Sequence, residues 1–359
     1  MGKPSPLLSG NWQSVVAIIS SVVDLEASAR QFGALRRRRK IRTAEALLRL
    51  ALIWGPGRQS LREAAALAAD AGIADLSDKA VEGRLRKLGD WLEHILAALL
   101  AHRLDRDSAP AVGEIALSLV DGSVICSPGS GDDWRLHARY DPALGRFTDL
   151  VLTPSRQAET ASRTRIGAGR VMVMDRGYAR VRSLQAVLGE GSDFITRIGW
   201  RSLVLHDANG QRIDLMSLLT EGASPSEHPV WVKGIDRGLR LVIQPLPPDI
   251  AERQRTRRAR KASKKSHTLD ARTAKAAGFM MLLTSLSQET SSTEQVIISY
   301  RDRWQVEIGF KRLKTLGRLD ELPSADPVLA RTWLLAHLIA AVLTDDLANE
   351  IVGFPPSAH

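Results

Sequence analysis

The chain has 359 residues, of which 44% are hydrophobic and 25% charged, a composition typical of a globular protein long enough for two or three domains. Lysine and arginine together number 50 against 40 aspartates and glutamates, so the net charge is +10 and a polyanionic partner is favoured over a membrane surface. The single cysteine, Cys126, excludes an internal disulfide and a cysteine-rich zinc site, and without a signal-peptide pattern we expect a soluble cytoplasmic protein.

The amino-terminal region is rich in alanine and leucine, and we expect a helical domain over residues 1–110. Arg42–Trp54 carries apolar residues at helical spacing, and Ser60 and Glu63 have the spacing of a capping box that opens the next helix. Another helix begins near Ser77. The two helices on either side of Gly72 resemble a DNA-binding helix-turn-helix, but their link is longer than the usual turn, so a plain helical bundle fits equally well.

A run of cations precedes these helices. Such runs are commonly solvated linkers, but in a chain that is basic overall we favour contact with DNA phosphates. That contact would add affinity and salt dependence without reading base sequence. The residues proposed for it are Arg36, Arg37, Arg38 and Arg39.

Strand-like apolar runs begin after residue 114, and they occupy residues 115–120, 134–140, 146–153, 171–174 and 194–198. A helix is expected over residues 160–167 and another up to residue 189. The first and fourth strands end on Asp121 and Asp175, and each of these acids is followed closely by a glycine. An aspartate at a strand end is more often a turn or cap residue. The same arrangement at two strand ends favours a functional role for both acids, because a glycine beside the acid lets the backbone make way for a substrate phosphate.

Residues 201–278 alternate between apolar and polar positions around glycine-containing turns, which predicts a β-rich insertion. The insertion runs into Arg253–Lys275, a tract of ten cations with few acids nearby. As a helix this tract would repel itself, so we expect it to be disordered without DNA and to bind a polyanion. The residues proposed for DNA contact are Arg257, Arg258, Lys264 and Lys265.

The stretch from Tyr300 to Lys314 predicts one continuous α-helix with two different faces. At about 100° per residue, one face is apolar, and the other gathers four polar side chains into an arc of roughly 60°. Ile298 and Val306 belong to the apolar stripe. The polar group suits a metal-assisted site on nucleic acid, because it places one acid among groups that bind phosphate. Its members are Tyr300, Arg303, Glu307 and Lys314.

The spacing Tyr-x2-Arg-x3-Glu-x6-Lys resembles the signature of the IS-four group of bacterial insertion-sequence transposases, which carry an Asp-Asp-Glu triad. Asp-Gly-Ser at Asp121 and Asp-Arg-Gly-Tyr at Asp175 are the settings that this group places around its first two acids. The resemblance implies an α/β fold with a ribonuclease-H-like core, a mixed sheet with flanking helices in which the first and fourth strands are neighbours. This core would occupy residues 111–200 and 279–359 around the insertion.

The resemblance also implies the chemistry. Asp121, Asp175 and Glu307 would hold two Mg²⁺ ions, for which Mn²⁺ can substitute, and would catalyse hydrolysis and strand transfer of DNA. Tyr300, Arg303 and Lys314 would hold the phosphates beside the scissile bond. The partners would be double-stranded DNA, as transposon ends and target, and a second copy of the chain in a homodimeric synaptic complex.

Other interpretations stay open at this stage. The protein could be a metal-dependent nuclease that cuts without strand transfer, or a DNA-binding protein without catalysis. Transposases of this group usually continue beyond a point equivalent to residue 359 into helices that aid dimerisation, so an inactive, shortened copy is also compatible with the sequence. An RNA-processing ribonuclease H fits less well, because it leaves the insertion and the Tyr-Arg-Glu-Lys face unexplained.

Overall fold

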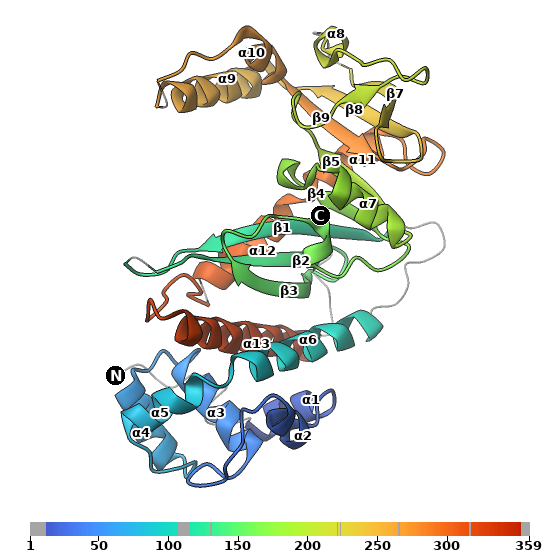
Figure 1. Ribbon diagram of the computed structural model, residues 1–359. Helices are drawn as coiled ribbons and strands as arrows, with labels where there is room; N and C mark the ends of the chain where they lie inside the picture. Colours follow the sequence, from blue (N-terminus) through green and yellow to red (C-terminus); the bar gives the residue numbers. More distant parts are fainter. Residues whose placement is uncertain are drawn as a thin grey trace.

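The computed structural model describes residues 12–106, 115–129, 131–220, 222, 224–264, 266–315 and 317–352. The amino-terminal part is helical and lies at one end of the molecule (Figure 1). The predicted capping box is confirmed, since Ser60 and Glu63 each accept a hydrogen bond from the other's backbone N–H. The helices are α1 (Trp12–Ser20), α2 (Leu25–Gln31), α3 (Ala44–Trp54), α4 (Leu61–Asp70), α5 (Asp78–Leu85) and α6 (Gly89–Arg106).

The strands form one sheet with the order β3-β2-β1-β4-β5-β9-β8-β7-β6. Strand β1 is parallel to β4, and β4 is parallel to β5, whereas the other neighbouring pairs are antiparallel. The expectation that the first and fourth strands are neighbours is therefore confirmed. The strands are β1 (Leu117–Ile125), β2 (Trp134–Asp141), β3 (Arg146–Pro154), β4 (Val171–Met174), β5 (Asp193–Arg197), β6 (Leu205–His206), β7 (Ser226–Val232), β8 (Leu239–Pro245) and β9 (Phe279–Thr284).

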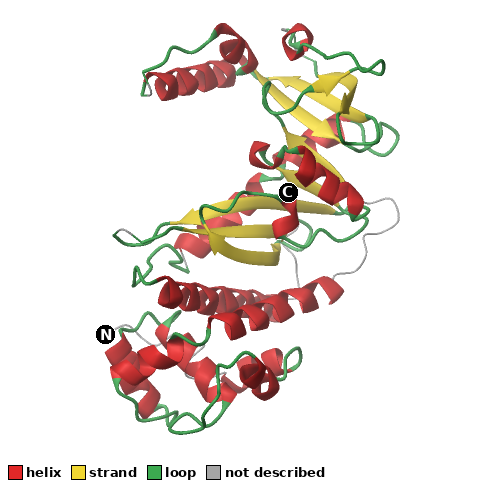
Figure 2. Ribbon diagram, viewed as in Figure 1, coloured by secondary structure: helices red, strands yellow, loops and turns green. Residues whose placement is uncertain are grey.

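The strands of the insertion extend the same sheet. Strand β9 pairs with β5 on one side and with β8 on the other, so the sheet continues from the centre of the molecule into the insertion (Figure 2). This arrangement covers the edge of β5, which would otherwise present unpaired backbone groups. The helix expected over residues 160–167 is only a 3₁₀ turn at Ala161–Arg163, because Thr164 already has an extended backbone.

Both faces of the sheet are buried at its central strand β4. Along β4, Val171 and Val173 belong to one hydrophobic cluster, and Met172 and Met174 belong to another, as expected from the alternation of side chains along a strand. The first cluster lies under α6, α12 (Trp304–Thr315) and α13 (Pro327–Val352), and the second includes α7 (Val181–Gly189) and the insertion. Helix α13 is long and apolar enough to span a membrane, but 72% of its most apolar window is buried inside the protein, so it serves as a core helix.

The basic tract contains a regular helix, which differs from the expected disorder. Helix α9 (Pro248–Ser263) projects beside the sheet, α10 (Ala271–Ala276) lies next to it, and α8 (Leu215–Leu218) contacts α10 (Figure 1). A proline opens α9, Ala251 is buried, and Asp249 pairs with Arg253 at 3.2 Å. These features favour the first turns and offset part of the repulsion among the cations.

Candidate active site

Asp121 and Asp175 are neighbours because of the parallel pairing of β1 with β4. In this register Val120 lies opposite Met174, so the next residue of each strand is one of the two acids. Strand β4 ends there, whereas β1 continues to Ile125 along β2, with Asp121 opposite Ala138. The predicted end of the first strand at residue 120 is therefore too early, although both acids do leave the paired region of β1 and β4 together.

The continuous helix expected from Tyr300 to Lys314 is in fact two helices. Helix α11 (Thr293–Arg301) ends one residue before a turn at Asp302 and Arg303, and α12 begins at Trp304. The break places Ile298 on the surface, 49% exposed, although the helical pattern predicted it to be buried. Val306 is buried as expected. From this turn, Arg303 reaches Asp121 in β1.

The tyrosine and the arginine of the motif contact all three acids. The Tyr300 hydroxyl donates a hydrogen bond to Asp175 Oδ1 at 3.1 Å. Arg303 donates through Nη1 to Asp121 Oδ2 at 3.0 Å and through Nη2 to Glu307 Oε1 at 2.6 Å. Tyr300 and Arg303 are therefore in contact with acids that precede them by more than a hundred residues in the chain, Asp175 and Asp121. Lys314 lies further along α12, where its Nζ donates to the Val124 carbonyl at 2.6 Å.

Burial perturbs the pKa values of Asp121 and Tyr300. The Asp121 side chain is only 20% exposed, and desolvation raises its pKa from the ordinary 3.8 to about 6, against the lowering effects of Arg303 and of the Gly122 N–H. Burial, with the charge of Asp175, also raises the pKa of Tyr300 to about 12, so its hydroxyl remains a donor. The site thus holds a carboxylate whose negative charge is incompletely compensated.

We expect the unfolding free energy to fall as the pH rises through about 6. A carboxyl group with a raised pKa binds more protons in the folded chain, so its stabilising contribution is full below the unfolded pKa and is lost as the pH rises through the folded pKa. The shift of Asp121 corresponds to roughly 3 kcal/mol. Asp121→Asn should remove that dependence, as measured by urea denaturation between about pH 4 and 8. Asp132→Asn, at a residue whose side chain is 79% exposed, should retain it. An unchanged slope for Asp121→Asn would contradict this expectation.

The donor set has the chemistry of a divalent metal site. Carboxylate oxygens are the ligands that Mg²⁺ and Mn²⁺ prefer, and Asp121 is a half-buried acid beside a cation of the protein itself, Arg303. Within the described part of the chain, no three acids, histidines or cysteines lie close enough to hold one ion together. The guanidinium of Arg303 occupies the position between Asp121 and Glu307, so direct metal binding by both acids requires this side chain to withdraw.

Two further arginines, Arg176 and Arg197, were not singled out from the sequence. Burial, with the like charges of Arg176 and Arg197, lowers the pKa of the half-buried Arg258. Arg176 follows Asp175, and Arg197 ends β5, the parallel neighbour of β4. The rule that the carboxyl ends of parallel strands share one edge of the sheet was the signal that could have identified Arg197.

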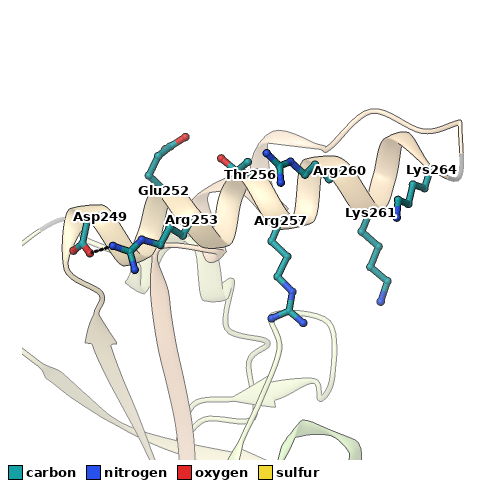
Figure 3. A pocket seen from close by; sticks show the side chains of 8 residues that line it. All are labelled: Asp249, Glu252, Arg253, Thr256, Arg257, Arg260, Lys261 and Lys264. Atoms are coloured by element: carbon teal, nitrogen blue, oxygen red, sulfur yellow. Dashed lines mark ion pairs between the residues drawn. The ribbon is translucent and has the colours of Figure 1, made fainter.

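The other residues predicted to bind DNA are exposed wherever the structure describes them. Arg257 and Lys264 belong to an exposed face of α9 that Figure 3 shows, together with Arg253, Arg260 and Lys261. Lys265 lies outside the described residues. The remaining four predicted residues lie in an exposed loop between α2 and α3; they are Arg36, Arg37, Arg38 and Arg39. Among them, Arg38 pairs with Glu26 at 2.7 Å.

Comparison with known proteins gives consistent matches. A family model described as the transposase DDE domain matches residues 117–343. The putative transposase InsL for insertion sequence element IS186A of Escherichia coli is 40% identical over 357 residues, which cover 96% of this chain and 96% of that protein. The transposase for insertion sequence element IS421 of Escherichia coli is 40% identical over 358 residues, with the same coverage. The transposase for insertion sequence element IS231C of Bacillus thuringiensis subsp. berliner is 22% identical over 339 residues, which cover 82% of this chain and 70% of that protein.

Proposed function

The chain belongs to the transposase DDE domain family, and from this premise we propose that it is the DNA transposase of an insertion sequence. It would bind the terminal inverted repeats of its element, cut the DNA and join the ends to a target. The observation that carries the proposal is the contact of Tyr300 and Arg303 with Asp121, Asp175 and Glu307. A structural ion-pair network would not require two of its acids to stand side by side at the end of parallel strands.

We further propose that the catalytic part is a ribonuclease-H-like core interrupted by the insertion. The order β3-β2-β1-β4-β5, with β1, β4 and β5 parallel, supports this assignment. The boundaries proposed from the sequence, at residues 110, 200 and 278, stay predictions. Strand β9 weakens the idea of a separable insertion, because it joins β5 to β8.

Asp121, Asp175 and Glu307 would hold two Mg²⁺ ions. When bound, these ions would activate a water or a 3′-hydroxyl and neutralise charge on the scissile phosphate. The protein's own contribution is orientation. Tyr300 fixes the carboxylate of Asp175, and Arg303 has a planar fork of donors that suits a phosphate as well as it suits Asp121 and Glu307. Arg303 would move from the acids to a DNA phosphate as metal and substrate enter.

The exposed face of α9 would bind the DNA backbone. Neutralising two of its cations with Arg257→Gln and Lys261→Gln should reduce the slope of log affinity against log salt by about two, at roughly 0.9 per lost phosphate contact. The measurement is a salt titration of binding to end DNA. The matched double variant Arg212→Gln with Lys233→Gln, at exposed sites outside both basic tracts and the amino-terminal helices, should keep the slope. Equal slopes for both variants would exclude this face as a DNA contact.

The cellular setting follows from the same proposal. The partners would be double-stranded DNA and, in the synaptic complex, a second copy of the chain, and the protein would act on the nucleoid in the bacterial cytoplasm. The exposed arginines at residues 36–39 would add phosphate contacts at the other end of the molecule.

The decisive experiment incubates the full chain with Mg²⁺ and DNA that carries the ends of its own element. Cleaved ends joined to a target would support the proposed transposase. Cleavage without joined products would support a nuclease, and specific binding without cleavage would support a DNA-binding protein that lacks catalysis.

A further inference from the structure

A fourth carboxylate lies beside two glycines that closely follow proposed metal-binding acids, one in strand β1 and one in the turn after β4. A Cβ added to Gly122 would lie 3.2 Å from Glu159 Oε1, and one added to Gly177 would lie 2.5 Å from Glu159 Oε2. Gly122 follows Asp121, and Gly177 is two residues after Asp175. The carboxylate of Glu159 therefore lies against both segments, and a side chain at Gly177 would have to displace it.

A buried hydroxyl lies in the same place and lacks a partner. Tyr178 is 1% exposed, and within the described part of the chain its hydroxyl makes no hydrogen bond. This oxygen would lie 3.5 Å from a Cβ on Gly122, and burial, with the charges of Asp121, Glu159 and Asp175, raises the pKa of Tyr178. A polar atom that is buried without a partner is costly, so the position calls for a ligand that can hydrogen-bond to it.

Neighbouring elements hold Glu159 in this position. The segment after it is fixed by a hydrogen bond from the Ala161 N–H to Ser183 Oγ of α7 at 2.9 Å. On the side of β2, Arg135 Nη1 lies 3.3 Å from Glu159 Oε1. The Glu159 side chain remains 30% exposed, so solvent can still reach it.

We propose that Glu159 and Tyr178 form an outer part of the metal site, where they bind the water molecules of the divalent cation held by Asp121 and Asp175. Magnesium in proteins keeps several of its waters, and each of these waters needs hydrogen-bond acceptors. Glu159 accepts from such a water, and the Tyr178 hydroxyl gains the partner it lacks. This inference rests on the proposed function, since it assumes that the acids bind metal.

The test is direct measurement of Mn²⁺ binding to the full chain without DNA, by electron paramagnetic resonance of the free ion. Loss of an outer-shell partner typically weakens metal affinity about 10- to 100-fold. Glu159→Gln should show a loss in this range without a change in the thermal unfolding temperature of the metal-free protein. Tyr178→Phe, which keeps the ring and removes only the hydroxyl, should weaken binding by about tenfold.

Arg135→Met separates this role from a structural one. It removes the ion pair of Glu159 and leaves the carboxylate, so it should not weaken Mn²⁺ binding. If Glu159→Gln left the affinity unchanged, or if Arg135→Met weakened it equally, Glu159 would only position the loop and the inference would fail. An unfolded Glu159→Gln would leave Tyr178→Phe to decide, with unchanged affinity as the contrary result.

Asp121→Asn distinguishes the inference from its premise. If Asp121→Asn abolishes Mn²⁺ binding and Glu159→Gln does not affect it, the inference alone fails. If Asp121→Asn binds Mn²⁺ as the unmodified chain does, the proposed metal site itself is wrong.

Discussion

Asp121→Asn is expected to lower the rate of DNA cleavage by about 10³-fold or more while the chain still binds end DNA. Stabilisation of the reacting phosphate by bound metal is worth several kcal/mol, and each 1.36 kcal/mol corresponds to a factor of ten in rate. The substitution keeps the size of the side chain and removes the charge that a divalent ion needs. The measurement is single-turnover cleavage of a labelled end fragment with Mg²⁺, with affinity determined separately by gel shift in Ca²⁺.

The matched control is Asp132→Asn, which removes a similar carboxylate from an exposed loop near the same sheet. Its cleavage rate should stay within about a factor of two of the unmodified chain, because surface ion pairs contribute little. Asp175→Asn and Glu307→Gln should behave as Asp121→Asn does. If any of the three retained full cleavage activity, that residue would not belong to the catalytic set.

Arg303→Ala is expected to weaken end binding and to strengthen metal binding in the absence of DNA. A hydrogen bond to a charged group contributes about 1.5–3 kcal/mol, so the loss of phosphate contacts should lower DNA affinity about 10- to 100-fold. In the free protein, Arg303 pairs with Asp121 and Glu307 and competes with a metal ion. A partly exposed ion pair is worth up to about 1 kcal/mol, so its removal should tighten Mn²⁺ binding roughly fivefold.

Two control variants make this result specific. Arg303→Lys keeps the positive charge but loses the planar fork of donors, so it should recover only part of the DNA affinity. Arg301→Ala removes an exposed arginine at the end of α11 and should change neither affinity. If Arg303→Ala instead abolished metal binding and left DNA affinity intact, the proposed role of Arg303 would be wrong.

Local patterns were sufficient for much of the fold. Apolar runs located β1 to β5 because strands buried on both faces need such residues, and hydroxyl caps located the starts of α4 and α5.

Local patterns were misleading where a tertiary contact overrides helical periodicity. Residues 300–314 have a helical repeat throughout, but the contacts of Tyr300 and Arg303 with the acids accompany a turn at Asp302. The basic tract was expected to be disordered from its charge, whereas α9 has acids in its first turns and a buried alanine.

By itself, the sequence determined which residues could form a phosphate-directed metal site, because residue type and spacing decide which groups can bind metal and phosphate. Only the tertiary structure decided how they meet. The parallel register of β1 and β4 places Asp121 beside Asp175, and the turn before α12 inserts Arg303 between Asp121 and Glu307. The neighbours Glu159 and Tyr178 could not be ranked from the sequence, since closeness between distant segments depends on strand register and packing rather than on any local pattern.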